Sequence, residues 1–197
     1  MFRLRTLGGA LIEGPEGPLT GAVSQRRRLA LLSLVAASRA GVSRDRVVAL
    51  LWPESDDEHA RHALAQLVYT LRRDLGRDVI TGSATSLRVD PDSMSSDVDD
   101  FGRAIAENQL ERAAELYAGP FLDGFHLGGC HEFERWVDDE RARLSLAARR
   151  TLETLAGQNA GGRAACRCSS LVAWAGRAGS VRRARRARAH EGARRER

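Results

Sequence analysis

One stretch of the chain, residues 57–75, places the strongest constraint on the fold, because its apolar residues repeat at helical spacing. At about 100° per residue, they fall on one broad face: Ala60, Ala63, Leu64, Leu67, Val68, Leu71 and Leu75. The run 55–58, Ser-Asp-Asp-Glu, precedes them with its acids where the helix dipole favours negative charge, and Gly76 follows. The spacing predicts a helix that buries one face and ends at Gly76.

The opposite face of this helix is polar. It carries His62, Gln66, Tyr69 and Arg73, with Arg72 at its margin. A DNA major groove accepts one α-helix, and side chains one turn apart can reach successive base edges. Gln suits adenine, and Arg suits guanine or a phosphate. A solvated helix face of no further function would have the same pattern, so the interpretation depends on the surrounding fold.

The flanking segments predict that fold. Residues 2–23 alternate short apolar runs with Gly and Pro turns, which indicates a small antiparallel sheet with strands near 2–7, 10–12 and 19–23. Two helices follow, one capped by Ser24 and a short one capped by Ser43 that ends at Trp52-Pro53. After the long helix, residues 79–80 and 87–89 are expected to pair as a hairpin. Sheet, three helices and hairpin make an α+β winged helix-turn-helix domain, residues 1–92.

The remainder divides in two. Residues 91–96 are expected to be a polar linker, and helices are predicted at 97–106, 110–117 and 132–156, giving an all-α domain over 93–157. A domain of this size has little core of its own, so contact with the first domain is expected. Residues 158–197 are rich in Arg, Ala and Gly and are predicted to be a disordered tail.

Charge is distributed unevenly. The chain has 31 basic residues, none of them Lys, 26 acidic ones and a net charge of +5. Residues 1–90 hold 13 Arg against 10 acids, residues 91–157 hold 7 against 14, and residues 158–197 hold 11 against 2. The tail therefore makes the chain basic. It offers non-specific affinity for DNA, so its removal should preserve specificity and lower the salt dependence of binding.

Several classes of protein are excluded. No run approaches the roughly 20 apolar residues of a membrane span. Three cysteines make no even disulfide framework, so a reducing cytoplasm is expected. No phosphate loop, nucleophile elbow or zinc-protease motif is present, so neither an enzyme nor a cofactor is expected. His126, Cys130, His131 and Glu132 have metal-ligand side chains, but their spacing matches no zinc pattern, and no metal site is predicted.

At this point the sequence resembles a known family over about residues 2–157. Arg-Arg-Arg-Leu-Ala-Leu-Leu at 26–32 resembles the first helix of OmpR-type winged-helix domains. The segment 43–53, SRDRVVALLWP, is similar to that family's SRDxLxxxLWP signature, and LRRDLG at 71–76 matches the end of its recognition helix. DVDDF at 97–101, LYAGPFL at 116–122 and WVDDERARL at 136–144 look like the bacterial transcriptional activator domain of SARP-type regulators.

The resemblance implies an activator that binds promoter DNA, often at direct repeats, and contacts RNA polymerase. It also implies that the second domain is a tetratricopeptide-like helical array. The sequence departs from the family at two places. The wing lacks the usual Gly-Tyr before Arg88, and residues 158–197 do not continue the helical array. The composition of this tail suits a GC-rich gene read out of frame, which remains a hypothesis.

Further arginines are candidates for DNA contact. Arg72 is expected to touch phosphate, as are Arg44 and Arg46 in the second helix and the run 26–28 in the first. Arg88 on the wing is a candidate for the minor groove, which attracts Arg where it is narrow. Each of these arginines has an alternative role as a solubilising residue or as an ion-pair partner for a nearby Asp.

The sequence as a whole predicts a DNA-binding transcriptional regulator with double-stranded promoter DNA as a partner, and the resemblance implies RNA polymerase as a second partner. Two copies on repeated half-sites would raise the affinity of a domain with so little net charge. Two alternatives stay open. One is a helical adaptor that binds other proteins, and the other is a truncated, non-functional fragment of a regulator.

Overall fold

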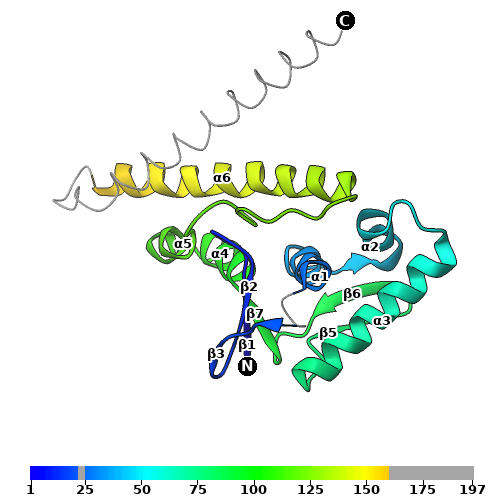
Figure 1. Ribbon diagram of the computed structural model, residues 1–197. Helices are drawn as coiled ribbons and strands as arrows, with labels where there is room; N and C mark the ends of the chain where they lie inside the picture. Colours follow the sequence, from blue (N-terminus) through cyan, green and yellow to red (C-terminus); the bar gives the residue numbers. More distant parts are fainter. Residues whose placement is uncertain (22–24, 160–197) are drawn as a thin grey trace, which may run out of the picture. The chain divides into compact units, whose positions relative to one another are not determined.

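The computed structural model describes residues 1–21 and 25–159. They divide at residue 144 into a compact unit, 1–144, and a segment that begins at Ser145. The first unit holds a four-stranded sheet, three helices, a three-stranded sheet and then the helices of the second half (Figure 1). The expected mixed α/β region followed by a helical region is therefore present.

The four-stranded sheet combines the N-terminus with a distant segment. It has the order β3-β2-β1-β7, from β1 (Phe2–Arg5), β2 (Leu11–Gly14), β3 (Gly17–Pro18) and β7 (Met94–Ser96). β1 is antiparallel to β2 and parallel to β7. Two sequence expectations are wrong here. The third strand lies at 17–18, and residues 19–21 of the expected strand 19–23 are not in a strand, while 22 and 23 lie outside the described residues. Residues 94–96 are a strand rather than linker because they pair with β1 and bury Met94.

The three helices of the winged region begin and end close to their predicted positions. They are α1 (Arg26–Ala36), α2 (Arg44–Leu51) and α3 (Asp57–Leu75). The Ser43 hydroxyl accepts the Arg46 amide at 3.2 Å and caps α2, as expected. Gly76 ends α3 with φ 66°, a left-handed conformation that favours glycine. The predicted cap at Ser24 lies outside the described residues.

The predicted hairpin is confirmed and gains a third strand. The sheet order is β4-β6-β5, from β4 (Val42–Ser43), β5 (Ile80–Gly82) and β6 (Ser86–Val89). A Cβ at Gly82 would lie 2.1 Å from the carbonyl oxygen of Ser86, so this turn requires glycine. The wing therefore forms although the Gly-Tyr segment of the family is missing before Arg88. Gly82, at the end of β5, supplies the tight turn.

The second half is helical at the predicted places. It contains α4 (Asp97–Ala106), α5 (Leu110–Leu116) and α6 (His131–Asn159). A short connection joins α4 to α5, and the rings of Phe101 and Tyr117 lie 5.5 Å apart between their centroids. Residues 145–159 continue α6, with Ala148, Thr151, Leu152 and Leu155 buried. The predicted tail lies outside the described residues from 160 onward.

Within residues 1–144, the expected contact between the two halves is present. Leu7 and Phe121 form an isolated antiparallel bridge, and the Gly8 amide donates to the Pro120 carbonyl at 3.0 Å. Arg39, after α1, bonds the Asp99 carboxylate at 2.6 Å. These contacts join the segment after β1 to the segment that follows α5, and the segment after α1 to α4. A domain boundary at residue 92 remains a prediction.

Candidate nucleic-acid interface

Helix α3 has the two faces that its sequence predicts. Ala60, Leu64, Leu71 and Leu75 are buried, while Ala63, Leu67 and Val68 are half-buried at the edges of the same face. His62, Gln66, Tyr69 and Arg73 are all exposed. Tyr69 is 58% exposed, which is high for an aromatic side chain and leaves its ring free to meet a ligand. The separation into an apolar and a polar face is confirmed, and contact of the polar face with DNA remains a prediction.

A buried ion pair fastens α3 to α1. The Arg28 guanidinium lies 2.6 Å from the Asp74 carboxylate, and Arg28 is only 6% exposed. Of the two roles that the sequence left open for Arg28, the structure shows ion pairing rather than phosphate contact, because its charge faces the protein interior. The partner, however, is Asp74 and not Asp45, Asp56 or Asp57. Hydrogen bonds from Arg28 first, and then from Arg73, hold the pKa of Asp74 below its ordinary value.

The two arginines near the end of α3 both meet carboxylates. Arg73 Nη2 lies 2.9 Å from Asp74 Oδ1, and its Nε donates to the same oxygen at 3.0 Å. Arg72 Nε lies 2.9 Å from Asp78 Oδ1. The side chains of Arg72 and Arg73 are 65% and 62% exposed, and such surface pairs are worth only about 0–1 kcal/mol each. Either guanidinium can therefore also bind a second acceptor at little cost.

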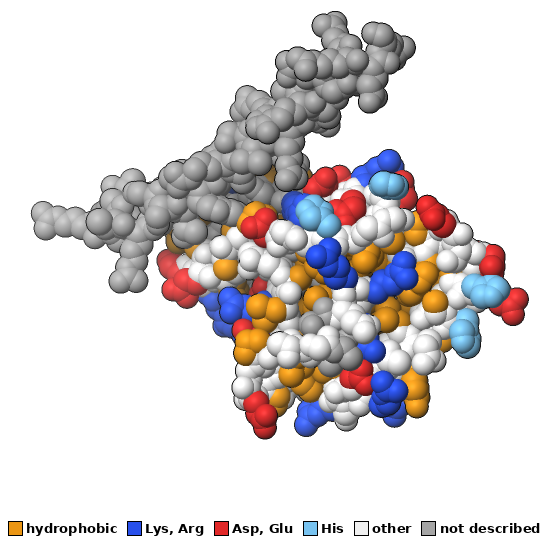
Figure 2. All heavy atoms as spheres, viewed as in Figure 1, with side chains coloured by type: hydrophobic (Ala, Val, Ile, Leu, Met, Phe, Trp, Pro, Cys, Tyr) orange, Lys and Arg blue, Asp and Glu red, His pale blue; other side chains and the backbone are white. Residues whose placement is uncertain are grey.

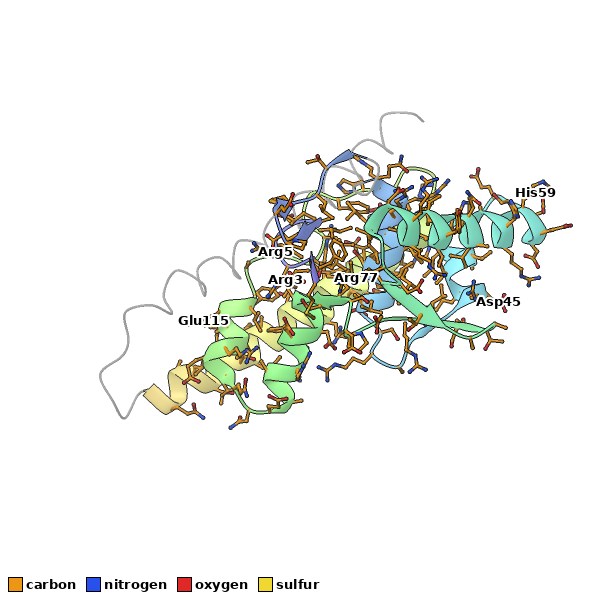
Figure 3. All side chains as sticks on the ribbon, turned by 90° about the horizontal axis from the view of Figure 1, so that it is seen from below. Arg3, Arg5, Asp45, His59, Arg77 and Glu115 are labelled. Atoms are coloured by element: carbon orange, nitrogen blue, oxygen red, sulfur yellow. The ribbon has the colours of Figure 1, made fainter. Side chains whose placement is uncertain are left out.

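The first turn of α3 is acidic. Asp56 caps the helix and is followed by Asp57 and Glu58, and Figure 2 shows acidic and histidine side chains at the right-hand edge, where Figure 1 places this end of α3. His59, labelled in Figure 3, lies 2.7 Å from Asp56. The backbone amide of His59, followed by its side chain, lowers the pKa of Asp56. Phosphates are repelled at this end, so any DNA contact by α3 must centre on its middle and C-terminal turns.

Arg44 ties the start of α2 to the tip of the wing. Its amide donates to the Thr85 carbonyl at 2.9 Å, and its Nε donates to the Ser83 carbonyl at 3.2 Å. Arg88 is exposed on β6, opposite Thr81 in the sheet register. The wing and the helix-turn-helix are therefore joined by main-chain and side-chain bonds, and Arg88 is carried on that joined surface.

The other candidate arginines have different surroundings. Arg26 Nη1 donates to the His126 carbonyl at 2.8 Å, and the Arg27 guanidinium lies 5.4 Å from the centroid of the Trp52 ring. Arg46 is exposed on α2. Sequence reasoning did not include Arg77, which is exposed just beyond Gly76 and forms no ion pair with a described residue. Figure 3 places it at the opposite end of α3 from His59. In the sequence, its position directly after the helix could have indicated it as a candidate for DNA contact.

The segment with metal-ligand side chains is used for other contacts. The Cys130 thiol is buried and donates to the Leu51 carbonyl at 3.4 Å, while His126 Nδ1 lies 3.2 Å from a Glu134 oxygen. Within residues 1–21 and 25–159, no three His, Cys, Asp or Glu side chains gather in an arrangement that could bind a metal ion. In the same residues, no helix is long and apolar enough to span a membrane.

A helix-turn-helix, a three-stranded wing packed beside it and a following helical region define a winged helix-turn-helix fold. The chain is similar to a solved structure of Mycobacterium tuberculosis EmbR in complex with a low affinity phosphopeptide, with a TM-score of 0.53 and 19% identity. The match covers 81% of this chain and 47% of that one, so this chain spans about half the length of its neighbour. No protein-family model and no curated protein match the sequence. The likeness supports the winged-helix fold expected from the sequence motifs.

Proposed function

We propose that this protein is a transcriptional regulator that binds double-stranded promoter DNA through α3. The observation that carries the proposal is the exposed row of His62, Gln66, Tyr69 and Arg73 on a helix whose other face is buried. Side chains of these types at turn spacing are what a major groove reads. The fold supports the proposal because a helix-turn-helix presents its second helix to the groove.

The flanking residues supply contacts to the DNA backbone in this proposal. Arg72, at the margin of the polar face, is assigned to a phosphate, and Arg88 on β6 to the minor groove beside the bound helix. Arg44 acts through the wing, because its guanidinium already bonds the Ser83 carbonyl at the wing tip. Phosphate contacts fix the register of the protein on the duplex, and the base contacts of α3 choose the sequence.

We propose that the helical half is the activating part of the regulator. Residues 91–157 hold 14 acidic residues against 7 Arg, which suits contact with a basic protein surface rather than with DNA. RNA polymerase is the partner that the sequence resemblance implies, and the same resemblance makes 93–157 an incomplete tetratricopeptide-like array. Two copies of the regulator on repeated half-sites would raise its affinity.

Selection of bound duplexes from a random pool, with the full chain as bait, tests DNA binding. The expected result is enrichment of one short sequence that Gln66→Ala changes at a single base pair, because Gln66 reads one base edge. Gln109→Ala is a matched control, since Gln109 is exposed at the start of α5, outside the proposed interface. Selection without enrichment at moderate salt would overturn the proposal and favour a protein-binding adaptor.

A further inference from the structure

We propose that Asp74 is a positioning residue that holds Arg73 for recognition of a guanine in the major groove. This inference rests on the proposed function and adds the identity of one base and of the residue that sets up its contact. The inference is drawn from two linked ion pairs. The carboxylate of Asp74 contacts the buried Arg28 on one side and the exposed Arg73 on the other.

The carboxylate of Asp74 is a fixed point. Its Oδ2 is held at 2.6 Å by the buried guanidinium of Arg28, and its side chain is only 14% exposed. Its other oxygen, Oδ1, is left for Arg73. Because one oxygen is anchored to α1, the second oxygen has a defined position at the edge of the polar face of α3.

Arg73 meets this oxygen with one side of its guanidinium. Nε donates to Oδ1 at 3.0 Å and Nη2 lies 2.9 Å from it. A guanidinium has five N–H donors in a fixed plane. The Nη1 hydrogens and the outer hydrogen on Nη2 remain, and Nη1 with Nη2 still forms a parallel pair of donors at the end of the group.

That end matches the major-groove edge of guanine. Guanine presents two acceptors there, N7 and O6, and a bidentate arginine is the commonest specific contact to them. A guanidinium that is already held at Nε loses less rotational freedom when it binds, which is the benefit of preorganisation. The side chain of Arg73 is 62% exposed, so its free end is accessible to a duplex.

Because Asp74 is negatively charged, the direction in which its removal changes DNA affinity tests the inference. Removing a negative charge beside phosphates should strengthen DNA binding if only long-range electrostatics matters. If Asp74 positions Arg73, its removal should instead weaken binding to the guanine-containing site. Asp78 supplies the comparison, because its carboxylate lies 2.9 Å from Arg72 but is 50% exposed, so its position is not fixed by burial.

The experiment is duplex selection followed by affinity measurement with the full chain. We expect Arg73→Ala to lose the preference for guanine at one position, with binding to the selected site falling roughly ten- to a hundred-fold. Asp74→Asn should weaken preference at the same position several-fold, while Asp78→Asn should leave it unchanged or bind slightly more tightly. Uniform weakening of all sequences by Arg73→Ala would identify a phosphate contact and overturn the inference.

Because Asp74→Asn leaves the buried Arg28 facing a neutral partner, its folding must be checked by thermal unfolding. Arg73→Lys provides a variant at an exposed position that keeps the charge and removes the planar fork. It should lose guanine preference as Arg73→Ala does, with the salt dependence of binding preserved. Retained preference in Arg73→Lys would also overturn the inference.

The outcomes separate this inference from the proposed function. If Gln66→Ala changes the selected sequence while Asp74→Asn behaves like Asp78→Asn, α3 reads DNA and the positioning role of Asp74 is wrong. If the wild-type chain selects no sequence, both the proposed function and this inference are wrong.

Discussion

The buried carboxylate of Asp97 accepts hydrogen bonds from both the amide and the hydroxyl of Thr6. The amide lies 2.9 and 2.8 Å from the two oxygens, and the hydroxyl lies 2.7 Å from Oδ1. Asp97 Oδ2 also accepts the Leu7 amide at 2.8 Å. Thr6 follows β1 and Asp97 opens α4, so one carboxylate joins segments that are 91 residues apart. Its charge also lies in the first turn of α4, where the helix dipole stabilises it.

We expect Asp97→Asn to lower the free energy of unfolding by about 2–4 kcal/mol. The side-chain NH2 of Asn would face buried N–H and O–H donors of Thr6 and Leu7, which now bond the two carboxylate oxygens. Urea unfolding at neutral pH measures the change. Asp92→Asn is the control, since Asp92 is exposed a few residues upstream. Equal stability of the two variants would show that the bonds to Thr6 contribute little.

The close approach of Gly8 and Gly119 leads to a second prediction, about the contact between the N-terminal segment and the helical half. A Cβ at Gly119 would lie 2.6 Å from the Gly8 Cα, whereas a Cβ at Gly102 in α4 meets nothing within 4 Å. Gly119→Ala should therefore destabilise the protein by about 1–3 kcal/mol through overpacking. Gly102→Ala should stabilise it by about 0.5–1 kcal/mol, because alanine favours a helix. Thermal unfolding of both variants checks the opposite signs, and a stabilising Gly119→Ala would contradict the contact.

Local patterns in the sequence were sufficient for the helices and for the two faces of α3. The period of its apolar residues predicted Leu64 and Leu71 inside and Gln66 outside, and all three lie as predicted. The hairpin was equally local, because its two strands are separated by a short turn. Such features are read directly from neighbouring residues.

Features that depend on distant residues were missed. β7 has only Met94 as a large apolar residue, and its strand conformation comes from pairing with β1, far away in the sequence. For the basic run at 26–28 the sequence left phosphate contact and ion pairing open, and it did not indicate that Arg28 pairs with Asp74. The candidate site on α3 could therefore be proposed from sequence, while the connection between its arginines could not, because it depends on an ion pair between α1 and α3.

The pKa of Asp74 predicts how stability responds to acid. Hydrogen bonds from Arg28 and then from Arg73 lower this pKa below its ordinary value of 3.8, so the unfolded chain binds a proton more readily than the folded one. The resulting stability is present above the ordinary value and is lost as the pH falls through the folded-state pKa. The pKa of Asp56 is lowered as well and acts in the same direction.

Asp74→Asn should therefore lose stability less steeply than the wild type between about pH 5 and pH 3. Its unfolding free energy at neutral pH should be the lower of the two, because the buried Arg28 loses its charged partner. Urea unfolding of both proteins across this range measures the slopes. Parallel curves would mean that Asp74 is not the group that couples folding to acid.

The last prediction concerns the basic segment 158–197, which holds 11 Arg against 2 acidic residues. If α3 chooses the sequence and this segment only adds positive charge, its removal should leave the selected DNA sequence unchanged and reduce the dependence of affinity on salt. Each phosphate contact that is lost should lower the slope of log affinity against log salt by about 0.9. A variant that keeps the segment, with Arg182, Arg183, Arg185, Arg186 and Arg188 changed to Gln, is the matched control. Its slope should be shallower than that of the wild type but steeper than that of the deletion, because six of the eleven Arg remain. A changed consensus sequence in either protein would mean that the segment takes part in reading bases, and an unchanged slope would mean that its charge does not reach the DNA.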